Sequence, residues 1–458
     1  MSGVCAAQAK PRRGDRCDGL KPVLRGMSRL RWALLLWLAL FSVASAVQRF
    51  PPPQFSEPRQ MPEPTTPPPR AAATEMIDVA VLVGALALGA YLIYKKRHRG
   101  WIVALVLFSL AYFGFWRQGC VCSVGAVGNV TLGIFDASYA LPLTVLAFFL
   151  LPLLFTLFFG RIFCGAVCPL GMVQELVLIR PLRVPRWLES GLRLFAWLYL
   201  GLAILMAATA SGLVICRYDP FIAFFRLGAN PQLWVISLSF LLIALFVGRP
   251  YCRFLCPYGV VLRQLGRLSK FRVKITPDEC INCRLCEDAC PFGAIDKPTV
   301  EWPDAQRIKA RRRARISAAL LPVIIVAGGW IGLRAAPALA QSNATVRLAD
   351  RIRMEEDGRV SDTTDESDAF RTTGRSVADL YDQADDKRRA FVIGSVLLGG
   401  AMGLLCGLTL IRSHICVQRD EYEAHRAGCV ACGRCFASCP REHRRRQQNR
   451  LPSAEHTA

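Results

Sequence analysis

Apolar runs about as long as a membrane-spanning helix recur along the whole chain, separated by charged segments. A helix needs about 20 apolar residues to cross a bilayer, and eight runs approach that length, at residues 30–47, 77–94, 101–117, 139–159, 192–213, 232–248, 316–336 and 390–411. With 53% hydrophobic residues and a mean hydropathy of +0.31, the chain is too apolar for a soluble protein of 458 residues. The sequence predicts an all-α polytopic membrane bundle of about seven or eight transmembrane helices.

The net charge of +23 is concentrated beside these apolar runs. Lys and Arg gather at residues 95–99, 180–193 and 307–315, and the loops after the second, fourth, sixth and eighth runs are the basic ones. By the positive-inside rule these loops face the cytoplasm. We therefore expect a multi-pass protein of the bacterial cytoplasmic membrane, in contact with membrane lipid. Charge distributed in this way does not require a nucleic-acid partner, and none is expected.

The N-terminal segment has the features of an export signal. Basic residues precede an apolar stretch that ends in Ala44-Ser45-Ala46, a small-residue cleavage pattern, so residues 1–47 are either a signal peptide or a signal anchor. Residues 48–75 follow, and their density of proline predicts an extended periplasmic linker.

Eight of the 19 cysteines form two identical C-x2-C-x2-C-x3-C-P runs. The first run contains Cys280, Cys283, Cys286 and Cys290, and the second contains Cys429, Cys432, Cys435 and Cys439. This is the spacing of bacterial ferredoxins, in which three closely spaced thiolates hold one [4Fe-4S] cluster and the fourth reaches the neighbouring cluster. We therefore assign Cys280, Cys283, Cys286 and Cys439 to one cluster, and Cys429, Cys432, Cys435 and Cys290 to the other. Zinc is the alternative metal, but zinc modules usually place two C-x2-C pairs farther apart.

The two runs lie in segments that membrane helices separate. Residues 271–306 form the first ferredoxin half, and residues 413–458 form the second half with a basic tail. Between them we expect transmembrane helices within 307–336 and 389–412. Two crossings return the chain to the side it left, so the halves can meet on the cytoplasmic side as one split dicluster module. The acidic segment 337–388 has no clear apolar period and is expected to be an outward, partly disordered periplasmic loop.

The predicted transmembrane core, residues 76–270, contains an internal repeat. The sequence from Gly160 through Cys164 to Cys168-Pro169 matches that from Gly248 through Cys252 to Cys256-Pro257. Both copies follow an outward-to-inward helix, so they should come together on one face of the membrane.

The repeat carries four cysteines, which we call the bundle cysteines: Cys164, Cys168, Cys252 and Cys256. Within each pair the two residues are four apart and would share one face of a helical turn. Together the four could hold a further metal or iron-sulfur centre or act as a redox dithiol pair. Alternatively, they could simply pack as small polarisable side chains.

Other candidates lie near the outer side. Cys120, Cys122 and Cys216 could form a disulfide in an oxidising periplasm, ligate a metal or serve as a redox couple. Asp136 and Asp219 lie within apolar sequence, where they would suit quinol deprotonation, although both could instead sit in water-exposed loops. None of the five histidines falls at the centre of a predicted helix, so a membrane haem held by two histidines is not expected.

Two C-x3-C-P motifs in the membrane core and two ferredoxin runs together resemble the NosR/NapH-type membrane polyferredoxin family, over about residues 100–440. The resemblance implies respiratory electron transfer between membrane or cytoplasmic donors and a periplasmic reductase, sometimes through a flavin domain. We find no long N-terminal flavin domain and no covalent flavin attachment motif in this sequence. We therefore expect any flavin to come only through a partner chain.

These features predict a membrane-bound iron-sulfur electron-transfer protein, an electron-transfer subunit of an oxidoreductase system with no catalytic residues of its own. The expected cofactors are two [4Fe-4S] clusters, with an additional metal or quinone left open. The expected partners are a periplasmic flavoprotein or reductase and a quinone or ferredoxin-like donor. The clusters carry the redox chemistry, while the protein sets their positions and potentials. The alternatives are a metallocentre assembly factor that uses the same clusters and a redox-sensing regulator.

Overall fold

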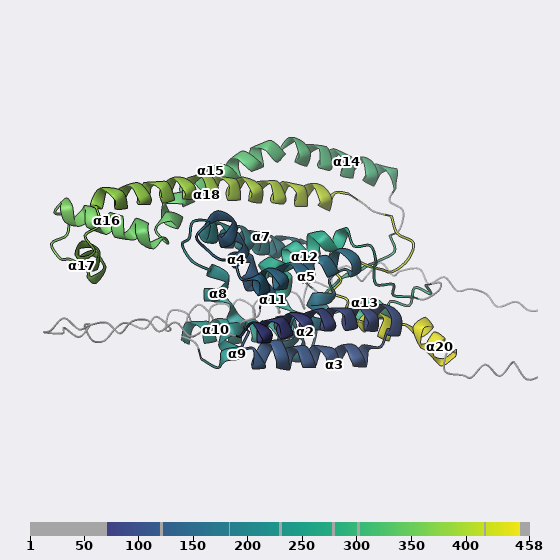
Figure 1. Cartoon of the computed structure of the whole chain (residues 1–458). Coiled ribbons are helices and arrows are strands. Elements are labelled where there is room, and N and C mark those ends of the chain that lie inside the picture. Colours follow the sequence, from purple (N-terminus) through teal and green to yellow (C-terminus); the bar gives the residue numbers. More distant parts are fainter. Residues whose placement is uncertain are drawn as a thin grey trace, which may run out of the picture.

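The computed structural model describes residues 71–119, 122–182, 184–228, 231–276, 280–299, 303–415 and 418–448. The predicted export signal, nearly all of the proline-rich linker and Cys120 lie outside these ranges. The long helices run side by side (Figure 1). One end of the bundle carries residues 280–299 and 418–448, and we call it the ferredoxin end. The opposite end carries the segment that joins the two longest C-terminal helices.

Short helices and π-helical segments (η) interrupt the long helices of the core. The elements of the core are, in chain order, α2 (Ala72–Tyr91), η1 (Leu92–Lys96), α3 (Arg99–Ser109), η2 (Leu110–Trp116), α4 (Ser123–Phe135), α5 (Leu143–Phe159), η3 (Phe163–Val167), α6 (Pro169–Leu176), α7 (Arg186–Ala208), α8 (Val214–Tyr218), α9 (Pro220–Arg226), α10 (Pro231–Ala244), α11 (Pro250–Phe254) and α12 (Pro257–Arg267). The remaining elements are α13 (Leu285–Asp288), β1 (Ile295–Asp296), α14 (Asp304–Ala319), α15 (Leu321–Ala340), α16 (Ala344–Glu356), α17 (Asp365–Thr372), α18 (Val377–Ser413), β2 (Glu423–Ala424), α19 (Arg434–Ala437) and α20 (Pro440–Gln448).

Five stretches of the described helices are long and apolar enough to cross a membrane. They are Ala72–Lys96, Arg99–Trp116, Trp187–Ala208, Leu321–Ala340 and Val377–Ser413. Helices α5 and α10 fall where the sequence predicts two further spans, but they are shorter, and α4 is an apolar helix that the run lengths did not predict. The seven or eight crossings remain a prediction. A polytopic, mostly helical membrane protein is nevertheless what these helices indicate.

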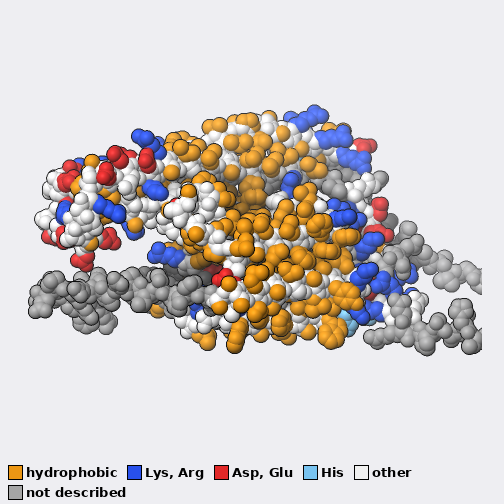
Figure 2. All heavy atoms as spheres, in the orientation of Figure 1, with side chains coloured by type: hydrophobic (Ala, Val, Ile, Leu, Met, Phe, Trp, Pro, Cys, Tyr) orange, Lys and Arg blue, Asp and Glu red, His pale blue; other side chains and the backbone are white. Residues whose placement is uncertain are grey.

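Hydrophobic side chains cover the middle of the molecule, as Figure 2 shows, whereas Lys and Arg gather at the ferredoxin end. On α15 and α18 large apolar residues face outward, among them Val326, Ile331 and Leu397, which are 71%, 62% and 68% exposed. Water would oppose the exposure of so much apolar surface, but lipid tails do not. The apolar band therefore marks the part of the bundle that lies in the bilayer.

Helices α15 and α18 form an antiparallel hairpin held by small residues. Gly332 of α15 packs against the backbone carbonyl of Ser395, and Gly399 of α18 packs against that of Gly328, so neither position has room for a Cβ atom. Glycines four residues apart on both helices allow this close approach, which is a common way for helices to associate in membranes. The hairpin runs the length of the bundle and returns the chain to the ferredoxin end.

The expectation of a partly disordered loop at 337–388 is wrong. Helices α16 and α17 occupy most of it, and α18 begins at Val377. Val346, Ala349 and Ile352 are spaced three apart on α16 and are buried against α18. Thr364 begins α17 with a reciprocal capping box. The dense Asp and Glu residues obscured this short apolar period in the sequence.

Helix α2 runs from the opposite end of the bundle to the ferredoxin end. Beyond its end, the Nε atom of Arg97 lies 3.1 Å from a carboxylate oxygen of Glu442 on α20, at the ferredoxin end. An α-helix rises about 1.5 Å per residue, so the 20-residue α2 spans roughly 30 Å. Residues near its start, including Glu75 and Asp78, therefore lie toward the opposite end.

Candidate iron-sulfur sites and the buried cysteines beside them

The two ferredoxin runs meet although 138 residues separate Cys290 from Cys429. Strands β1 and β2 pair antiparallel, with Ile295 opposite Ala424, and α13 contacts α19. The thiol of Cys290 lies close enough to those of Cys429, Cys432 and Cys435 for their charges to interact. These are the three residues that the sequence assigns to one cluster with Cys290. The reciprocal position of Cys439 beside the first run stays a prediction.

Both runs curl in the same way around their cysteines. The backbone is left-handed, with positive φ, at Asn282 and Arg284 in the first run and at the matching positions Ala431 and Gly433 in the second. Left-handed turns cost non-glycine residues energy, and such turns aim successive N–H groups into one concave space. The N–H of Ala431, for example, points at the Cys429 sulfur, 3.4 Å away. This backbone suits a bound cluster that accepts hydrogen bonds through sulfur.

Among the described residues, no group of three or more His, Cys, Asp or Glu side chains converges on one ion position. Sulfur atoms around one zinc ion stand about 3.8 Å apart, given a Zn–S bond of about 2.3 Å in a tetrahedron. An iron-sulfur cube holds its ligands farther apart, because the cube itself lies between them.

The second cysteine of each C-x3-C-P motif begins a new helix. Cys168 is the N-cap of α6 and Cys256 is the N-cap of α12, each followed by proline at the first helical position. The N–H of Gly259 donates to the Cys256 sulfur at 3.3 Å, whereas the Cys168 side chain makes no capping hydrogen bond at the start of α6. The prediction that each cysteine pair shares one helical face is therefore wrong, because a break falls between the two members.

All four bundle cysteines come together. Cys168 interacts electrostatically with Cys164 and Cys252, and Cys256 interacts with the other three. Cys164 packs with Cys290 and Cys432 of the ferredoxin runs against one small buried cluster, whereas Cys168 lines a cavity within the bundle. The internal repeat therefore brings its two copies to one place, as the sequence predicts.

Each copy of the repeat docks on the opposite ferredoxin run. Gly165, in the first copy, lies against the backbone carbonyl of Val430 in the second run. Gly248, in the second copy, lies against the carbonyl of Pro291 in the first run, where an added Cβ would come within 2.9 Å of the oxygen. Two close backbone contacts thus fix both runs directly on the loops that carry the bundle cysteines.

A buried carboxylate on α6 links these parts through ion pairs. Glu175 accepts from Arg249 Nε at 3.1 Å and from Arg434 of the second run at 2.8 Å, and Arg99 lies 3.4 Å away. Burial opposes its ionisation, but the guanidinium groups of Arg249 and Arg434 lower the pKa of Glu175 to about 2. Glu175 therefore stays ionised and ties the second run to the bundle. Sequence reasoning missed it, because its three partners come from distant segments.

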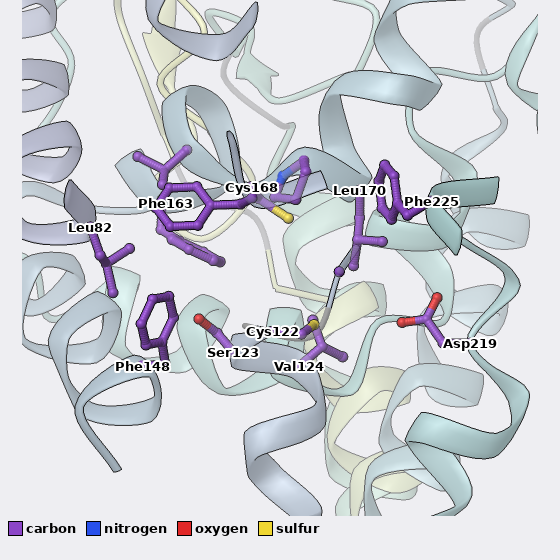
Figure 3. Close-up of a pocket in the computed structure, with 14 residues that line it drawn as sticks. Leu82, Cys122, Ser123, Val124, Phe148, Phe163, Cys168, Leu170, Asp219 and Phe225 are labelled. Carbon is purple, nitrogen blue, oxygen red and sulfur yellow. The ribbon is translucent and has the colours of Figure 1, made fainter. Parts of the chain in front are cut away.

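Toward the opposite end, a cavity of about 380 Å³ is lined by charged and small residues. Its lining includes Glu75, Cys122, Cys216 and Asp219, together with the ion pair between Asp78 and Arg117. A narrower, mostly apolar cavity continues past Phe148 and Phe225, and Figure 3 shows Cys122 and Cys168 facing it from opposite sides. The two cavities share Cys122, Phe148 and Asp219.

The two outer aspartates differ in their surroundings. Asp219 is 3% exposed, caps α9 by accepting from the Phe221 N–H at 2.9 Å, and lies in a turn between short helices. Burial raises the pKa of Asp219 to about 6, although that hydrogen bond lowers it. Asp136 instead bonds Ser138 in a turn, and these hydrogen bonds lower its pKa. The burial and raised pKa of Asp219 suit a group that gains and loses protons near neutral pH, whereas the lowered pKa of Asp136 does not.

Among the outer cysteines, Cys122 and Cys216 lie near each other. They interact electrostatically, and the Cys216 sulfur would stand 3.0 Å from a Cβ placed on Gly125, one turn along the helix that Cys122 caps. A disulfide, metal or redox role for this group stays a prediction, and Cys120 lies outside the described residues.

Comparison with known protein families identifies the cysteine-bearing segments. A family described as "4Fe-4S binding domain" matches residues 141–186 and 231–276, and a second family of the same description matches residues 273–296. The first two segments carry the bundle cysteines, and the third carries the first ferredoxin run.

Curated relatives agree with these matches. The chain is 28% identical over 243 residues to the regulatory protein NosR of Stutzerimonas stutzeri, covering 48% of this chain and 33% of that protein. It is 28% identical over 228 residues to the ferredoxin-type protein NapH of Haemophilus influenzae, and the match covers 45% of this chain and 76% of that protein. These homologues, together with the matched 4Fe-4S binding domains, support a relationship to NosR/NapH-type polyferredoxins.

A third relative is the putative electron transport protein YccM of Escherichia coli, 33% identical over 170 residues, which are 33% of this chain and 46% of that protein. The chain thus spans a third of the length of NosR and less than half of YccM. No solved structure matches it. Iron-sulfur binding and a general role in electron transport follow from these relatives.

Proposed function

We propose that this protein passes electrons between two [4Fe-4S] clusters on the cytoplasmic side of the bacterial inner membrane and a redox partner on the periplasmic side. The observation that carries the proposal is the continuous placement of redox-capable groups. The ferredoxin runs dock on the bundle cysteines, and one bundle cysteine, Cys168, lines the cavity that leads toward the opposite end. Such an arrangement suits stepwise transfer through the protein.

In this proposal Cys280, Cys283, Cys286 and Cys439 hold one cluster, and Cys429, Cys432, Cys435 and Cys290 hold the other. Bound there, a [4Fe-4S] cluster supplies reversible one-electron oxidation and reduction. The chain's own residues orient the thiolates, aim backbone N–H groups at sulfur and exclude water from the second run, where Cys435 and Cys439 are buried. Cys283 of the first run is exposed, so a ferredoxin-like or other cytoplasmic donor would approach there.

At the periplasmic side, the cavity beside Asp219 is the proposed quinone site. A quinone and its quinol interconvert by gain or loss of two electrons and two protons, so the site needs a proton acceptor within reach. The Asp219 carboxyl is buried in the cavity wall and has a pKa of about 6, which places it near neutrality for this task. The two electrons released by a quinol would reduce the two [4Fe-4S] clusters by one electron each, and Asp219 would accept one of the two protons and pass it to the periplasm.

A cavity-filling substitution tests this proposal. Phe148→Trp adds bulk to a side chain that lines both cavities, whereas Leu150→Trp enlarges a side chain that is 42% exposed on the same helix. Dithionite-reduced protein is mixed with a short-chain quinone, and cluster reoxidation is followed by absorbance. We expect Phe148→Trp to slow reoxidation at least about tenfold, equivalent to about 1.4 kcal/mol, and Leu150→Trp to leave it unchanged. Equal rates in all three proteins would reject the quinone site.

The matched relatives do not favour the alternative role in metallocentre assembly, because the names of several describe electron transport or ferredoxin-type proteins. A periplasmic reductase or flavoprotein remains the proposed partner on that side, with any flavin held by the partner.

A further inference from the structure

A buried guanidinium group lies against the second ferredoxin run. Arg161 stands three residues before Cys164 of the first C-x3-C-P motif and is 3% exposed. Its Nη1 atom donates to the backbone carbonyl of Ala427 at 3.2 Å, two residues before Cys429, and its Nη2 atom lies 3.6 Å from the Cys164 sulfur. Arg161 is also close enough to the Cys429 sulfur for their charges to interact. The positive charge of Arg161 is therefore held beside the second run.

Three more arginines reach the same run from different segments. Arg249, at the position of the internal repeat that matches Arg161, is 2% exposed and interacts electrostatically with Cys432. Arg99 donates to the backbone carbonyl of Cys432 at 3.1 Å, and Arg434 belongs to the run itself. All three share one carboxylate, that of Glu175. The second run is therefore surrounded by an excess of positive charge.

The first run has different surroundings. Its Cys283 is exposed to solvent, and Glu287 and Asp288 directly follow Cys286 in α13. Lys297 pairs with Glu287 at 2.8 Å, but the Lys297 side chain is 51% exposed, so water and salt screen its charge. The first run thus combines solvent with neighbouring carboxylates, whereas the second run combines burial with guanidinium groups.

Helix α20, which follows Cys439, is also basic, but its charges are paired and partly screened. Arg445 and Arg446 have side chains that are 41% and 30% exposed, and both lie near the buried carboxylate of Glu442. Arg97 contacts the same carboxylate at 3.1 Å. Exposed charges act weakly at a distance in salt. We therefore expect α20 to affect the potential of a bound cluster less than a buried guanidinium group does.

A buried positive charge bears directly on cluster reduction. Four thiolates outweigh the positive charge of a [4Fe-4S] core, so the bound cluster is an anion that gains a further negative charge when it accepts an electron. Net charge and solvent exposure around a cluster are among the features that set its reduction potential. Burial alone opposes the added negative charge, whereas nearby guanidinium groups favour it, and more strongly inside the protein than in water.

We propose that Arg99, Arg161 and Arg249 are positioning residues that hold the reduction potential of the second-run cluster above that of the first-run cluster. When the pair holds one electron, that electron then resides on the second-run cluster, beside Cys164 of the bundle. The step is the passage of one electron from the first-run cluster to the second-run cluster, with no proton or bond exchanged. This inference rests on the function proposed above and adds the order of the two clusters to it.

A redox titration of the full-length protein tests this order. Anaerobically purified protein in detergent is titrated with dithionite, and the clusters are followed by electron paramagnetic resonance (EPR). Cys432→Ser and Cys283→Ser assign the reduction waves, because each removes a predicted ligand of one cluster. We expect the wave that Cys432→Ser abolishes or shifts to have the higher midpoint potential. Equal potentials, or a higher potential for the first run, would overturn the proposed order.

Substitution of Arg161 tests the cause of the order. Arg161→Gln removes the charge and keeps a donor, so we expect the ratio of reduced to oxidised second-run cluster to fall at least tenfold at a fixed potential, equivalent to about 59 mV. Arg161→Lys keeps the charge and should restore most of this shift. Arg307→Gln, at an exposed position on α14, is the control. Equal second-run potentials in Arg161→Gln and Arg307→Gln would overturn the electrostatic role.

The outcomes separate this inference from the proposed function. If no cluster signal appears in the wild type, both fall. If two clusters are reduced but the first run is reduced before the second, only the order falls and the two-cluster protein stands. If Arg161→Gln does not retain its clusters, Arg99→Gln is titrated in its place, because the Arg99 side chain is 28% exposed. An unchanged second-run potential in Arg99→Gln would then count against the inference.

Discussion

The α-carbon of Gly165 lies so close to the backbone carbonyl of Val430 that a Cβ atom there would overlap the oxygen. Gly165 belongs to the C-x3-C-P motif of the bundle, and Val430 lies between two cysteines of the second ferredoxin run. This contact joins segments 265 residues apart in sequence, and it is backbone on one side, so a side chain cannot move away to relieve it. It fixes the distance between the cluster-binding run and the bundle cysteines.

Replacement of Gly165 by alanine should push the second run off the bundle. Overpacking of this kind typically costs about 1–3 kcal/mol, and we expect a lower thermal unfolding midpoint together with faster loss of cluster absorbance in air. Gly84→Ala on α2 is the matched control, because no atom lies within 4 Å of its added Cβ. A Gly165→Ala protein that matches the Gly84→Ala protein in both measurements would refute the docking contact.

Glu175 should prove essential to the same interface. Glu175→Gln leaves Arg249 and Arg434 without their shared carboxylate, and removal of one partner from a buried ion pair costs about 3–5 kcal/mol. Denaturant unfolding of the detergent-solubilised protein, followed by cluster absorbance, measures the loss. Glu366→Gln, at an exposed position on α17, should change little. Similar stabilities for the two variants would show that the ion pairs of Glu175 do not stabilise the contact between the second run and the bundle.

Asp219 should make stability depend on pH. Its folded pKa of about 6 lies above the ordinary value of 3.8, so the folded protein binds this proton more tightly than the unfolded chain. The stabilisation is complete below about pH 3.8 and is lost as pH rises through 6, by an amount on the order of 3 kcal/mol. Asp219→Asn should flatten this part of a thermal-stability profile, and Asp136→Asn, in an exposed turn, should not. A profile that keeps its slope in Asp219→Asn would contradict the assignment.

Cys290 should belong to the cluster of the second run. The Cys290→Ser variant is expected to lose or alter the cluster that Cys429, Cys432 and Cys435 hold, because Cys290 lies beside those three thiols. EPR of the reduced variant should then show one cluster with its magnetic interaction removed. The same experiment on Cys429→Ser should give a matching spectrum. Two unlike residual spectra would show that Cys290 and Cys429 serve different clusters.

The chemistry of the ferredoxin runs could be predicted from sequence because cysteine spacing encodes it directly. The internal repeat likewise predicted that Cys164, Cys168, Cys252 and Cys256 would meet. The surroundings of Arg161 and Glu175 could not be predicted in this way, because their partners lie in distant segments of the chain. No local sequence pattern around either residue indicates those partners. Helix α4 was missed because Gly125, Gly128 and Asn129 interrupt its apolar run, although the two glycines let Cys216 and Leu213 pack closely against the helix.

The most direct test of electron transfer by paired clusters is low-temperature EPR with iron and sulfide quantitation, on anaerobically purified protein before and after reduction with dithionite. Two reduced [4Fe-4S] signals broadened by mutual magnetic interaction are the predicted result, since the two runs pack against each other through β1 and β2. Zinc in place of iron, with no signal on reduction, would contradict the account and leave a membrane protein with structural metal sites.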